Sequence, residues 1–320
     1  MSINRATLGV KTVVVIGASG FIGEHLLAVL AGHKDIEVRV LMHRTRAKSQ
    51  ANINYIEGDL LKPDSLDVLL SNNCTVINLA YLAQNNLEAI TNLANACVKN
   101  KIRRLIHCST AAVVGRTKSD FVDETTMCHP VSEYQRTKLQ IEAILLEMTV
   151  DRFEVTILRP TAVFGLYGKN LLKLANELLT GNMWTNYLRS CLFNRRSMNL
   201  VAVENVVAAL VFLLDAEKVD REIFIISDDG SAENNYRDVE NRLLTAFGMH
   251  YHISRLPVPA FILSVLLRMA GRSNTNPSII YGDKKLAALG FDKPQNIEKA
   301  IDAFATWYKN SCDAKKTGHL

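Results

Sequence analysis

A short apolar segment that leads directly into evenly spaced glycines is the feature that most constrains the fold of this chain. Residues 12–16 are β-branched and too few for a helix, whereas an apolar pattern with helical spacing begins at Phe21. The glycines of the turn and of the first helical residues are Gly17, Gly20 and Gly23. Glycine allows a positive φ and a close approach to the backbone, and a helix N-terminus presents free N–H groups. The segment predicts a strand-turn-helix unit that binds a pyrophosphate, or a tight turn without a ligand.

Strand-like and helix-like segments alternate through the first half of the chain. After residues 12–16, the strand-like segments are EVRVLMH (37–43), NINYIEG (52–58), CTVINLA (74–80), RLIHCST (104–110) and EVTILRP (154–160). Helical patterns occur between them, at residues 64–70, 87–98 and 133–148. Such alternation predicts the α/β class, as a Rossmann-type, doubly wound parallel sheet with helices on both faces. Ligands of such sheets bind at the carboxyl ends of the strands, which is where the glycine turn lies.

The pattern changes after Pro160, where mostly helical segments follow a loop. One of these helices, YRDVENRLLTAFG, is expected to stop at Gly248. We expect a nucleotide-binding domain at residues 1–160 and a smaller, mostly helical substrate-binding region at residues 161–320. Segments near residues 200–228 are expected to return to the sheet.

Composition limits the partners and the compartment. The 320 residues carry a net charge of +5 with acidic and basic residues well mixed, which argues against nucleic acid and leaves anionic small molecules. Six cysteines are scattered without a C-x-x-C pair, so we expect no metal site and a reducing cytoplasm. The N-terminal residues lack an apolar signal segment. The longest apolar stretch, VPAFILSVLL (258–267), is too short for a membrane span and predicts a core or lid helix, with an interfacial helix as the alternative.

Polar side chains with catalytic potential follow the fifth strand-like segment. Ser109 and Thr110 end that segment, and Tyr134 and Lys138 lie four residues apart in a helical pattern. This spacing places the phenol and the ammonium on one helix face. A phenol has a pKa of about 10, which a nearby ammonium lowers by favouring the phenolate. Together with a hydroxyl that binds the substrate oxygen, the pair predicts a proton donor beside a carbonyl. The alternative is a surface tyrosine and lysine on an amphipathic helix.

The motifs together resemble those of the extended short-chain dehydrogenase/reductases, the group that includes nucleotide-sugar epimerases and dehydratases. They are GASGFIG (17–23), EGDL (57–60), INLA (77–80), CSTAAVVG (108–115), YQRTK (134–138) and LRPTAVFG (158–165). By this resemblance Thr110, Tyr134 and Lys138 form the catalytic triad, and Lys138 also binds the nicotinamide ribose. Asp59 and Leu60 would line the adenine pocket, although Asp59 could equally cap its own turn. The cofactor residues that the resemblance implies are Gly17, Ser19, Gly20, Phe21, Ile22, Gly23, Arg44, Asp59, Leu60, Ala80, Tyr134 and Lys138.

Residues at two places in the sequence limit which reaction and which cofactor we expect. Ala111 and Ala112 stand where family dehydratases carry an Asp-Glu pair, which argues against dehydration. Arg44, with Arg46 or Lys48, follows the second strand-like segment, where members that prefer NAD usually carry an acidic residue. A guanidinium at this place favours a 2′-phosphate, so NADP(H) is the expected cofactor and NAD(H) the alternative.

Two further matches concern the substrate. By resemblance to sugar-nucleotide enzymes, Asn170 in GKNLLKL contacts the nucleotide, and Arg196 in NRRSMNLVAVENV binds its diphosphate. A surface salt bridge is the alternative for the arginine. The NRRS segment and IFIISDDGSAENNY (223–236) look most like reductases and epimerases of polysaccharide sugar synthesis.

This closer resemblance implies an NAD(P)H-dependent reductase of the 4-keto group of a UDP-linked deoxysugar. The alternatives are a nucleotide-sugar 4-epimerase with tightly bound NAD, a reductase of a hydrophobic ketone such as a steroid or flavonoid, and a dinucleotide-binding sensor without catalysis. Family members often form homodimers through two helices, which correspond here to residues 87–98 and 133–148 and would build a four-helix bundle.

Overall fold

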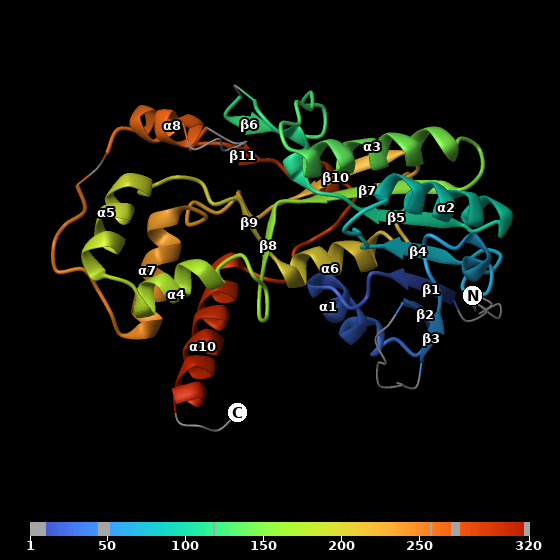
Figure 1. The fold of residues 1–320 in the computed structure, drawn as a ribbon, viewed down its shortest axis with the longest axis horizontal. Coiled ribbons are helices and arrows are strands. Elements are labelled where there is room, and N and C mark those ends of the chain that lie inside the picture. The colour runs from blue at the N-terminus through green and yellow to red at the C-terminus, as the bar shows by residue number, and fades with distance from the viewer. Residues whose placement is uncertain (1–10, 44–51, 118, 257, 270–275, 317–320) are drawn as a thin grey trace, which may run out of the picture. The chain divides into compact units, whose positions relative to one another are not determined.

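The computed structural model describes residues 11–43, 52–117, 119–256, 258–269 and 276–316. A seven-stranded sheet has the strand order β10-β7-β5-β4-β1-β2-β3 (Figure 1). The pairings from β7 to β3 are parallel. The strands are β1 (Lys11–Ile16), β2 (Ile36–Met42), β3 (Ile53–Glu57), β4 (Thr75–Asn78), β5 (Arg104–Cys108), β7 (Glu154–Pro160) and β10 (Glu222–Ile226). The chain order reverses at β1, between β2 and β4, which is where ligands of such sheets bind.

The chain divides into two compact units. Unit 1 comprises the chain up to Ser109 together with Thr137–Leu158 and Leu210–Ile223. Unit 2 comprises Thr110–Arg136, Arg159–Ala209 and the chain from Phe224 onward. The division into two domains at residue 160 stays a prediction.

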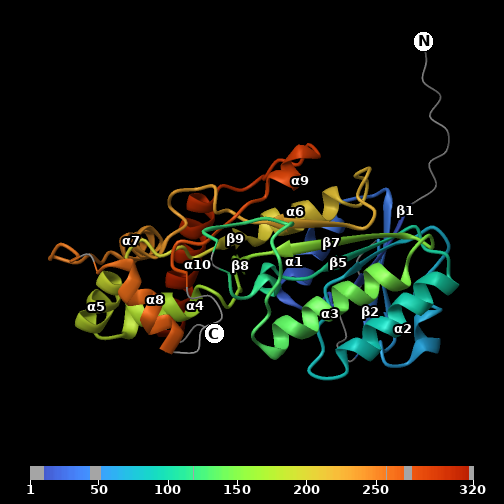
Figure 2. The same cartoon turned by 90° about the horizontal axis from the view of Figure 1, so that it is seen from above.

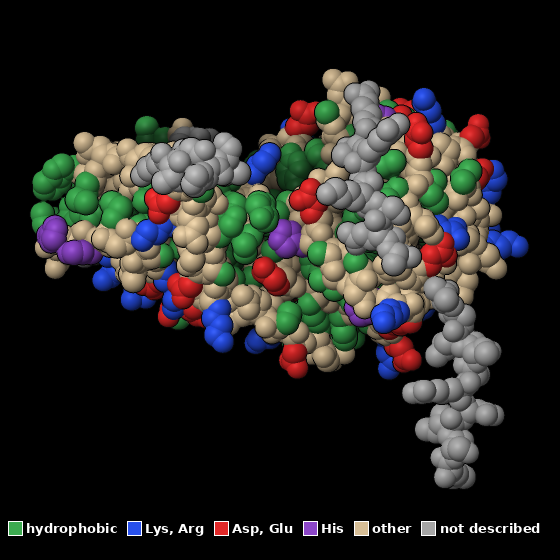
Figure 3. Space-filling model, turned by 90° about the horizontal axis from the view of Figure 1, so that it is seen from below, with side chains coloured by type: hydrophobic (Ala, Val, Ile, Leu, Met, Phe, Trp, Pro, Cys, Tyr) green, Lys and Arg blue, Asp and Glu red, His purple; other side chains and the backbone are tan. Residues whose placement is uncertain are grey.

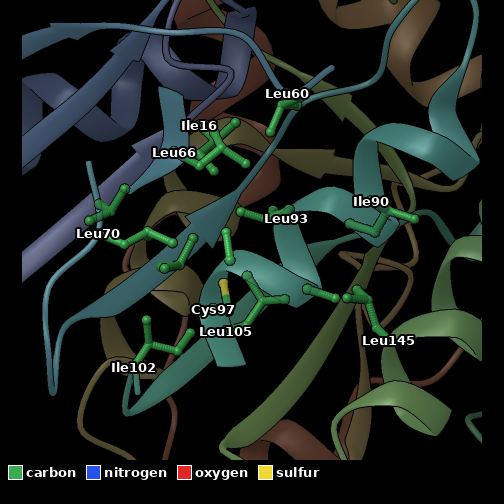
Figure 4. Packing of buried hydrophobic residues seen from close by; sticks show 14 of the residues in the cluster. Ile16, Leu60, Leu66, Leu70, Ile90, Leu93, Cys97, Ile102, Leu105 and Leu145 are labelled. Carbon is green, nitrogen blue, oxygen red and sulfur yellow. The ribbon is translucent and has the colours of Figure 1, made fainter. Parts of the chain in front are cut away.

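The core of unit 1 explains the continuous run of apolar residues in β1. Val13, Val14 and Val15 have no exposed surface although neighbouring residues point to opposite faces, so both faces of β1 are covered. On one face, side chains of α2 (Asn86–Lys99) and α3 (Glu133–Met148) pack against the strands, and Figure 2 shows the two helices side by side. Figure 4 shows part of this cluster, with Leu93 and Cys97 among the buried side chains. Helix α1 (Phe21–Leu30) also belongs to unit 1, whereas α6 (Val203–Phe212) begins in unit 2 and only its last three residues belong to unit 1.

The prediction of a helix at residues 64–70 is wrong. The chain forms only a single 3-10 turn there, η1 (Pro63–Leu66), followed by turns. Leu66 and Leu69 are nevertheless fully buried. A 3-10 turn places residues three apart on the same side, so the segment buries its leucines without a longer helix.

Unit 2 is mostly helical and has its own core. Its helices are α4 (Leu172–Thr180), α5 (Met183–Phe193), α7 (Tyr236–Phe247), α8 (Ala260–Met269), α9 (Lys284–Ala288) and α10 (Ile297–Lys316). Two short parallel strand pairs complete it, namely β8 (Ala162–Phe164) with β9 (Leu200–Ala202) and β6 (Phe121–Val122) with β11 (Ile280–Tyr281). Helix α7 ends at Gly248, as expected, because this glycine adopts φ +74°. Within the described ranges, no helix is both long enough and apolar enough to cross a membrane.

Candidate active site

Two close backbone approaches shape the glycine turn after β1. Gly17 has φ +82°, and a Cβ built on it would lie 2.7 Å from the backbone nitrogen of Ala80. A Cβ on Gly23 would lie 2.5 Å from the carbonyl oxygen of Gly17. The fold therefore requires glycine at both positions. Gly20 differs, because its φ is −82° and its Cβ would meet only the Gly17 oxygen, at 3.3 Å.

Helix α1 begins at this turn without a side-chain cap. Gly20 is the N-cap residue and offers no side-chain acceptor to the first N–H groups of the helix. Ser19 and Gly20 are exposed, and Phe21 and Ile22 are half-buried. The predicted cofactor residues of the turn thus lie together, at a helix end whose N–H groups and positive dipole favour a phosphate.

The predicted adenine contacts are held by bonds within their own segment. The Asp59 carboxylate accepts a hydrogen bond from the Leu61 N–H at 2.9 Å, and the Asp59 N–H donates to Ser65 Oγ at 2.9 Å. The second carboxylate oxygen lies 3.3 Å from His43 Nε2. Leu60 is buried in the core of unit 1. Asp59 therefore caps its own turn, which is the alternative that the sequence left open, and its contact with adenine stays a prediction.

Lys138 is buried although it carries a charge. The residue is 4% exposed, and its Nζ donates a hydrogen bond to the carbonyl oxygen of Cys108 at 3.1 Å. The ammonium also lies 5.1 Å from the ring centroid of Tyr81. Burial lowers the pKa of Lys138, whereas the charges of Cys108 and Glu142 act in the opposite direction. The same burial raises the pKa of the Cys108 thiol to about 11, so this thiol is not a nucleophile at neutral pH.

A buried carboxylate that we did not single out from the sequence lies one helical turn beyond Lys138. Glu142 is 2% exposed, and its carboxylate accepts a hydrogen bond from the Ser109 hydroxyl. Tyr134, Lys138 and Glu142 follow one another along α3 at i, i+4 spacing. This repeat was the available signal in the sequence. A glutamate on a helix is usually exposed, however, and only the fold shows that this one is buried.

A buried histidine also lies close to this group of residues. His107 of β5 pairs in register with Asn78 of β4, and its Nδ1 lies 3.2 Å from the Asn78 side-chain nitrogen. Burial, and secondly the positive charge of Lys138, hold the pKa of His107 well below its ordinary value. The imidazole is therefore neutral at neutral pH and adds no second cation near Lys138.

Thr110 and Tyr134 each stand at the start of a helix. Thr110 caps the 3-10 helix η2 (Ala111–Val114), where its hydroxyl oxygen accepts a hydrogen bond from the Ala112 N–H at 3.2 Å. The residue is half-buried, and its O–H can donate to a ligand. Tyr134 lies in the first turn of α3 and is 43% exposed. The predicted triad thus consists of a buried ammonium, a phenol accessible from solvent and a partly accessible hydroxyl.

The two predicted substrate residues are held by contacts within unit 2. Asn170 is exposed, and its side-chain nitrogen donates to the carbonyl oxygen of Val163 in β8 at 2.6 Å. Arg196 is half-buried, and its guanidinium lies 5.4 Å from the ring centroid of Phe193. These contacts fix the segments that follow β8 and precede β9. They leave the assignment of both residues to the substrate as a prediction.

A family model described as "NAD dependent epimerase/dehydratase family" matches residues 13–227, which include the glycine turn and the Tyr134–Lys138 pair. The chain belongs to this family. A nicotinamide dinucleotide is therefore its cofactor class, and the prediction of an NAD(P)-dependent oxidoreductase or epimerase is confirmed.

Relatives in the epimerase/dehydratase family resemble this chain over almost its full length. A UDP-glucose 4-epimerase of Vibrio cholerae is 24% identical, over 91% of this chain and 93% of the relative. An N-acetyl-α-D-glucosaminyl-diphospho-ditrans,octacis-undecaprenol 4-epimerase of Escherichia coli O157:H7 is 23% identical, also over 91% and 93%. The structure of a dTDP-glucose 4,6-dehydratase from Bacillus anthracis in complex with NAD has a TM-score of 0.72 at 15% identity, covering 95% of this chain and 98% of the other. This likeness confirms the predicted Rossmann-type fold.

Three residues after β2 are expected to decide between NADP(H) and NAD(H). They are Arg44, Arg46 and Lys48, and all three lie outside the described residues. The preference for NADP(H) over NAD(H) therefore stays a prediction.

Proposed function

We propose that this family member reduces the 4-keto group of a nucleotide-linked deoxysugar, with UDP as the nucleotide. The observation that carries the proposal is Lys138, buried and bonded to the Cys108 carbonyl one helical turn from the exposed Tyr134. A fixed ammonium favours the phenolate form of a nearby tyrosine, which makes the phenol a better proton donor at neutral pH. This arrangement also argues against a binding protein without catalysis, because such a protein does not need a buried cation beside an accessible phenol.

The residues of unit 1 fit a nicotinamide dinucleotide. The first N–H groups of α1 have no side-chain cap, and Gly20 has no side chain that could block an approach to the backbone, so both suit the pyrophosphate. Lys138 would bind the nicotinamide ribose, and Asp59 with Leu60 would border the adenine. We assign the cofactor to the domain at residues 1–160, with further contacts from Gly17, Ser19, Phe21, Ile22, Gly23 and Ala80. When bound, the nicotinamide supplies the hydride.

The triad residues then act on the sugar oxygen. Thr110 donates a hydrogen bond that orients the C4 carbonyl, while its oxygen remains bonded to the Ala112 N–H. Tyr134 transfers its proton to the oxygen at C4 as that oxygen gains negative charge. Lys138 stabilises the resulting phenolate by its positive charge. Glu142 and Ser109 hold the polar interior of α3 beside Lys138 without contacting the sugar.

The region at residues 161–320 is assigned to the nucleotide sugar. Asn170 would contact the nucleotide, and Arg196 would bind the diphosphate through two parallel hydrogen bonds. The names of the relatives support a sugar diphosphate substrate, because the Vibrio cholerae protein is named for UDP-glucose and the Escherichia coli protein for a sugar on a diphosphate lipid. A homodimer through α2 and α3 is part of the proposal and can be tested by sedimentation velocity.

A second candidate is a 4-epimerase, and a specific observation favours it. Both relatives described above carry 4-epimerase in their names. The same triad serves this reaction, with Tyr134 first accepting the proton from the C4 hydroxyl and later returning it. An epimerase regenerates its cofactor in each cycle and therefore needs no external reductant, whereas a reductase consumes one NAD(P)H per turnover.

The experiment that decides between them follows the cofactor and the sugar together. The protein is purified and denatured, and any released nucleotide is identified by mass spectrometry. Parallel reactions contain a UDP-4-keto-6-deoxysugar with NADPH or NADH, and UDP-glucose or UDP-N-acetylglucosamine without reductant, and products are read by NMR. A reductase oxidises the added cofactor and forms a C4 alcohol. Bound NAD with C4 inversion in the absence of reductant identifies the epimerase, and turnover of a steroid or flavonoid ketone alone refutes both.

The choice of NADPH as reductant has its own test. A guanidinium bonded to a 2′-phosphate contributes about 1.5–3 kcal/mol, or roughly tenfold to a hundredfold in affinity. Arg44→Ala should therefore weaken NADPH binding by that factor while leaving NADH binding nearly unchanged. Equal effects on the two cofactors would show that Arg44 does not bind the 2′-phosphate.

A further inference from the structure

Helix α8 of unit 2 exposes an apolar face that the proposed function does not use. Among the residues of α8 whose burial is described, only Leu263 and Leu267, one turn apart, are buried, at 3% and 6% exposure. Phe261 is 69% exposed and Met269 is 79% exposed. Apolar side chains thus point away from the core along the whole helix. The exposed large apolar residues of α8 are Phe261, Ile262, Val265, Leu266 and Met269.

Helix α5 and the loop before α8 also expose large apolar side chains. Tyr187 of α5 donates a hydrogen bond to the carbonyl oxygen of Ser254 at 2.9 Å, and Arg255 donates to Ser190 of α5, so the loop is fixed to α5. Figures 1 and 2 both place α5 and α8 at the same end of unit 2. Hydrophobic side chains gather at that end in Figure 3, on the left. The exposed apolar residues of α5 and the loop are Met183, Trp184, Leu188, Ile253 and Leu256. We call these ten residues the apolar face.

The two sequence stretches that carry the apolar face contain basic residues but no acidic ones. Residues 178–203 contain three arginines and residues 241–282 contain four, and neither stretch contains an aspartate or a glutamate. Three of these arginines are paired with acids from neighbouring segments: Arg189 with Glu177, Arg242 with Glu233 and Asp302, and Arg255 with the buried Glu240 at 3.0 Å. Arg268 on α8 is exposed and has no acidic partner among the described residues. An apolar face beside the exposed cation of Arg268 complements an anionic surface.

We propose that the apolar face docks on the surface of an anionic phospholipid bilayer. A soluble monomer rarely exposes so many neighbouring large apolar side chains without a partner. An isologous contact with a second copy would bring Arg268 of both copies, which has no acidic partner in the described part of the chain, toward the same interface, and this disfavours self-association. A bilayer offers both an apolar layer and negative headgroups. Tryptophan and arginine, here Trp184 and Arg268, are suited to the boundary between the two.

The dimensions of α8 fit docking on the surface rather than insertion across it. Its ten residues span about 15 Å at 1.5 Å per residue, which is about half of the hydrocarbon thickness of a bilayer. The helix would lie in the interface with Phe261 and Met269 in the acyl region. This inference is independent of the proposed reaction, since it concerns side chains outside the glycine turn and the triad.

Vesicle binding by the full chain tests the proposal. Sedimentation is measured with vesicles of phosphatidylcholine alone and of phosphatidylcholine mixed with phosphatidylglycerol, at low and high salt. We expect strong binding to the mixed vesicles, weaker binding to phosphatidylcholine, and a decrease with salt. Phe261→Gln and Met269→Gln should each weaken partitioning by about tenfold, and Arg268→Gln by about fivefold. Val68→Gln, at a 70% exposed position of unit 1, is the matched control and should bind like the parent.

The fluorescence of Trp184 gives a second measurement, which can be made on the unmodified protein. The chain has two tryptophans, and Trp184 is 65% exposed within the apolar face. Its emission should shift to shorter wavelength with mixed vesicles, and Trp184→Phe should remove the shift. The proposal is overturned if the parent neither sediments with mixed vesicles nor shifts its emission. It is equally overturned if Val68→Gln weakens binding as much as Phe261→Gln, or if the parent forms a dimer that Phe261→Gln dissociates.

Discussion

Replacing Gly20 by alanine separates the folding role of the glycine turn from its proposed binding role. A Cβ added at Gly17 or Gly23 would lie only 2.7 or 2.5 Å from a backbone atom, but a Cβ at position 20 meets only the Gly17 oxygen, at 3.3 Å. The φ of Gly20, −82°, is accessible to alanine without strain. At an N-cap, alanine is less favourable than glycine by about 0.5–1 kcal/mol, and the restriction of the unfolded chain offsets about 0.4–1 kcal/mol of this. The free energy of unfolding should therefore change by less than about 1 kcal/mol.

The effect on cofactor affinity should be much larger. If the pyrophosphate lies against the uncapped N–H groups of α1, a methyl group at position 20 occupies the approach to them. Loss of one hydrogen bond to a charged phosphate costs about 1.5–3 kcal/mol, or roughly tenfold to a hundredfold in affinity. Gly20→Ala should thus bind NADPH and NADH at least tenfold more weakly than the parent, as measured by isothermal titration calorimetry.

Gly17→Ala is the matched control for stability. Its φ of +82° costs alanine about 1–2 kcal/mol, and the contact with the Ala80 nitrogen adds to this cost. We expect the Tm of Gly17→Ala to fall by several degrees, about 2–4 °C per kcal/mol, while that of Gly20→Ala stays within about 3 °C of the parent. Parent-like dinucleotide affinity in a fully folded Gly20→Ala protein would refute the placement of the pyrophosphate at this turn.

Three further substitutions test the remaining site residues. Tyr134→Phe should lower turnover by about a hundredfold to ten-thousandfold with cofactor affinity unchanged, and turnover within threefold of the parent would exclude Tyr134 as the acid. Glu142→Gln keeps a hydrogen-bond acceptor for Ser109 but removes the negative charge that raises the pKa of Lys138. The pKa of Lys138 should therefore fall, and the alkaline limb of the pH–kcat profile should move to lower pH. An unmoved limb would exclude this coupling, and Ser109→Ala is the control that keeps the charge. Arg196→Ala should raise the KM for the nucleotide sugar and reduce the protection that UDP gives in a thermal shift assay, without changing NADPH binding. Undiminished protection by UDP would refute the assignment of Arg196 to the diphosphate.

The local organisation of the site was predictable because its causes are local. The β-branched residues before Gly17 and the apolar spacing after Phe21 define the strand-turn-helix unit within twenty residues. The helix at 133–148 was predicted with the limits that the structure shows, because its periodicity is long and uninterrupted. The four-residue spacing of Tyr134 and Lys138 follows directly from that helix. Short apolar segments carry less information, and the residues at 64–70 form a single 3-10 turn in place of the expected helix.

Burial, by contrast, depends on residues that are distant in the sequence, and only the tertiary structure decided it. The sequence left a surface lysine as the alternative for Lys138 and gave Glu142 no role, yet in the structure both are buried, with Cys108 and Ser109 as their hydrogen-bond partners. The stretch 258–267 shows the opposite case. Its hydropathy predicted a core or lid helix, with an interfacial helix as the alternative. Among the large apolar side chains of α8, unit 2 buries only Leu263 and Leu267 and leaves Phe261 exposed, which argues against a core helix. Hydropathy states what a side chain prefers, whereas the available contacts depend on how the whole chain packs.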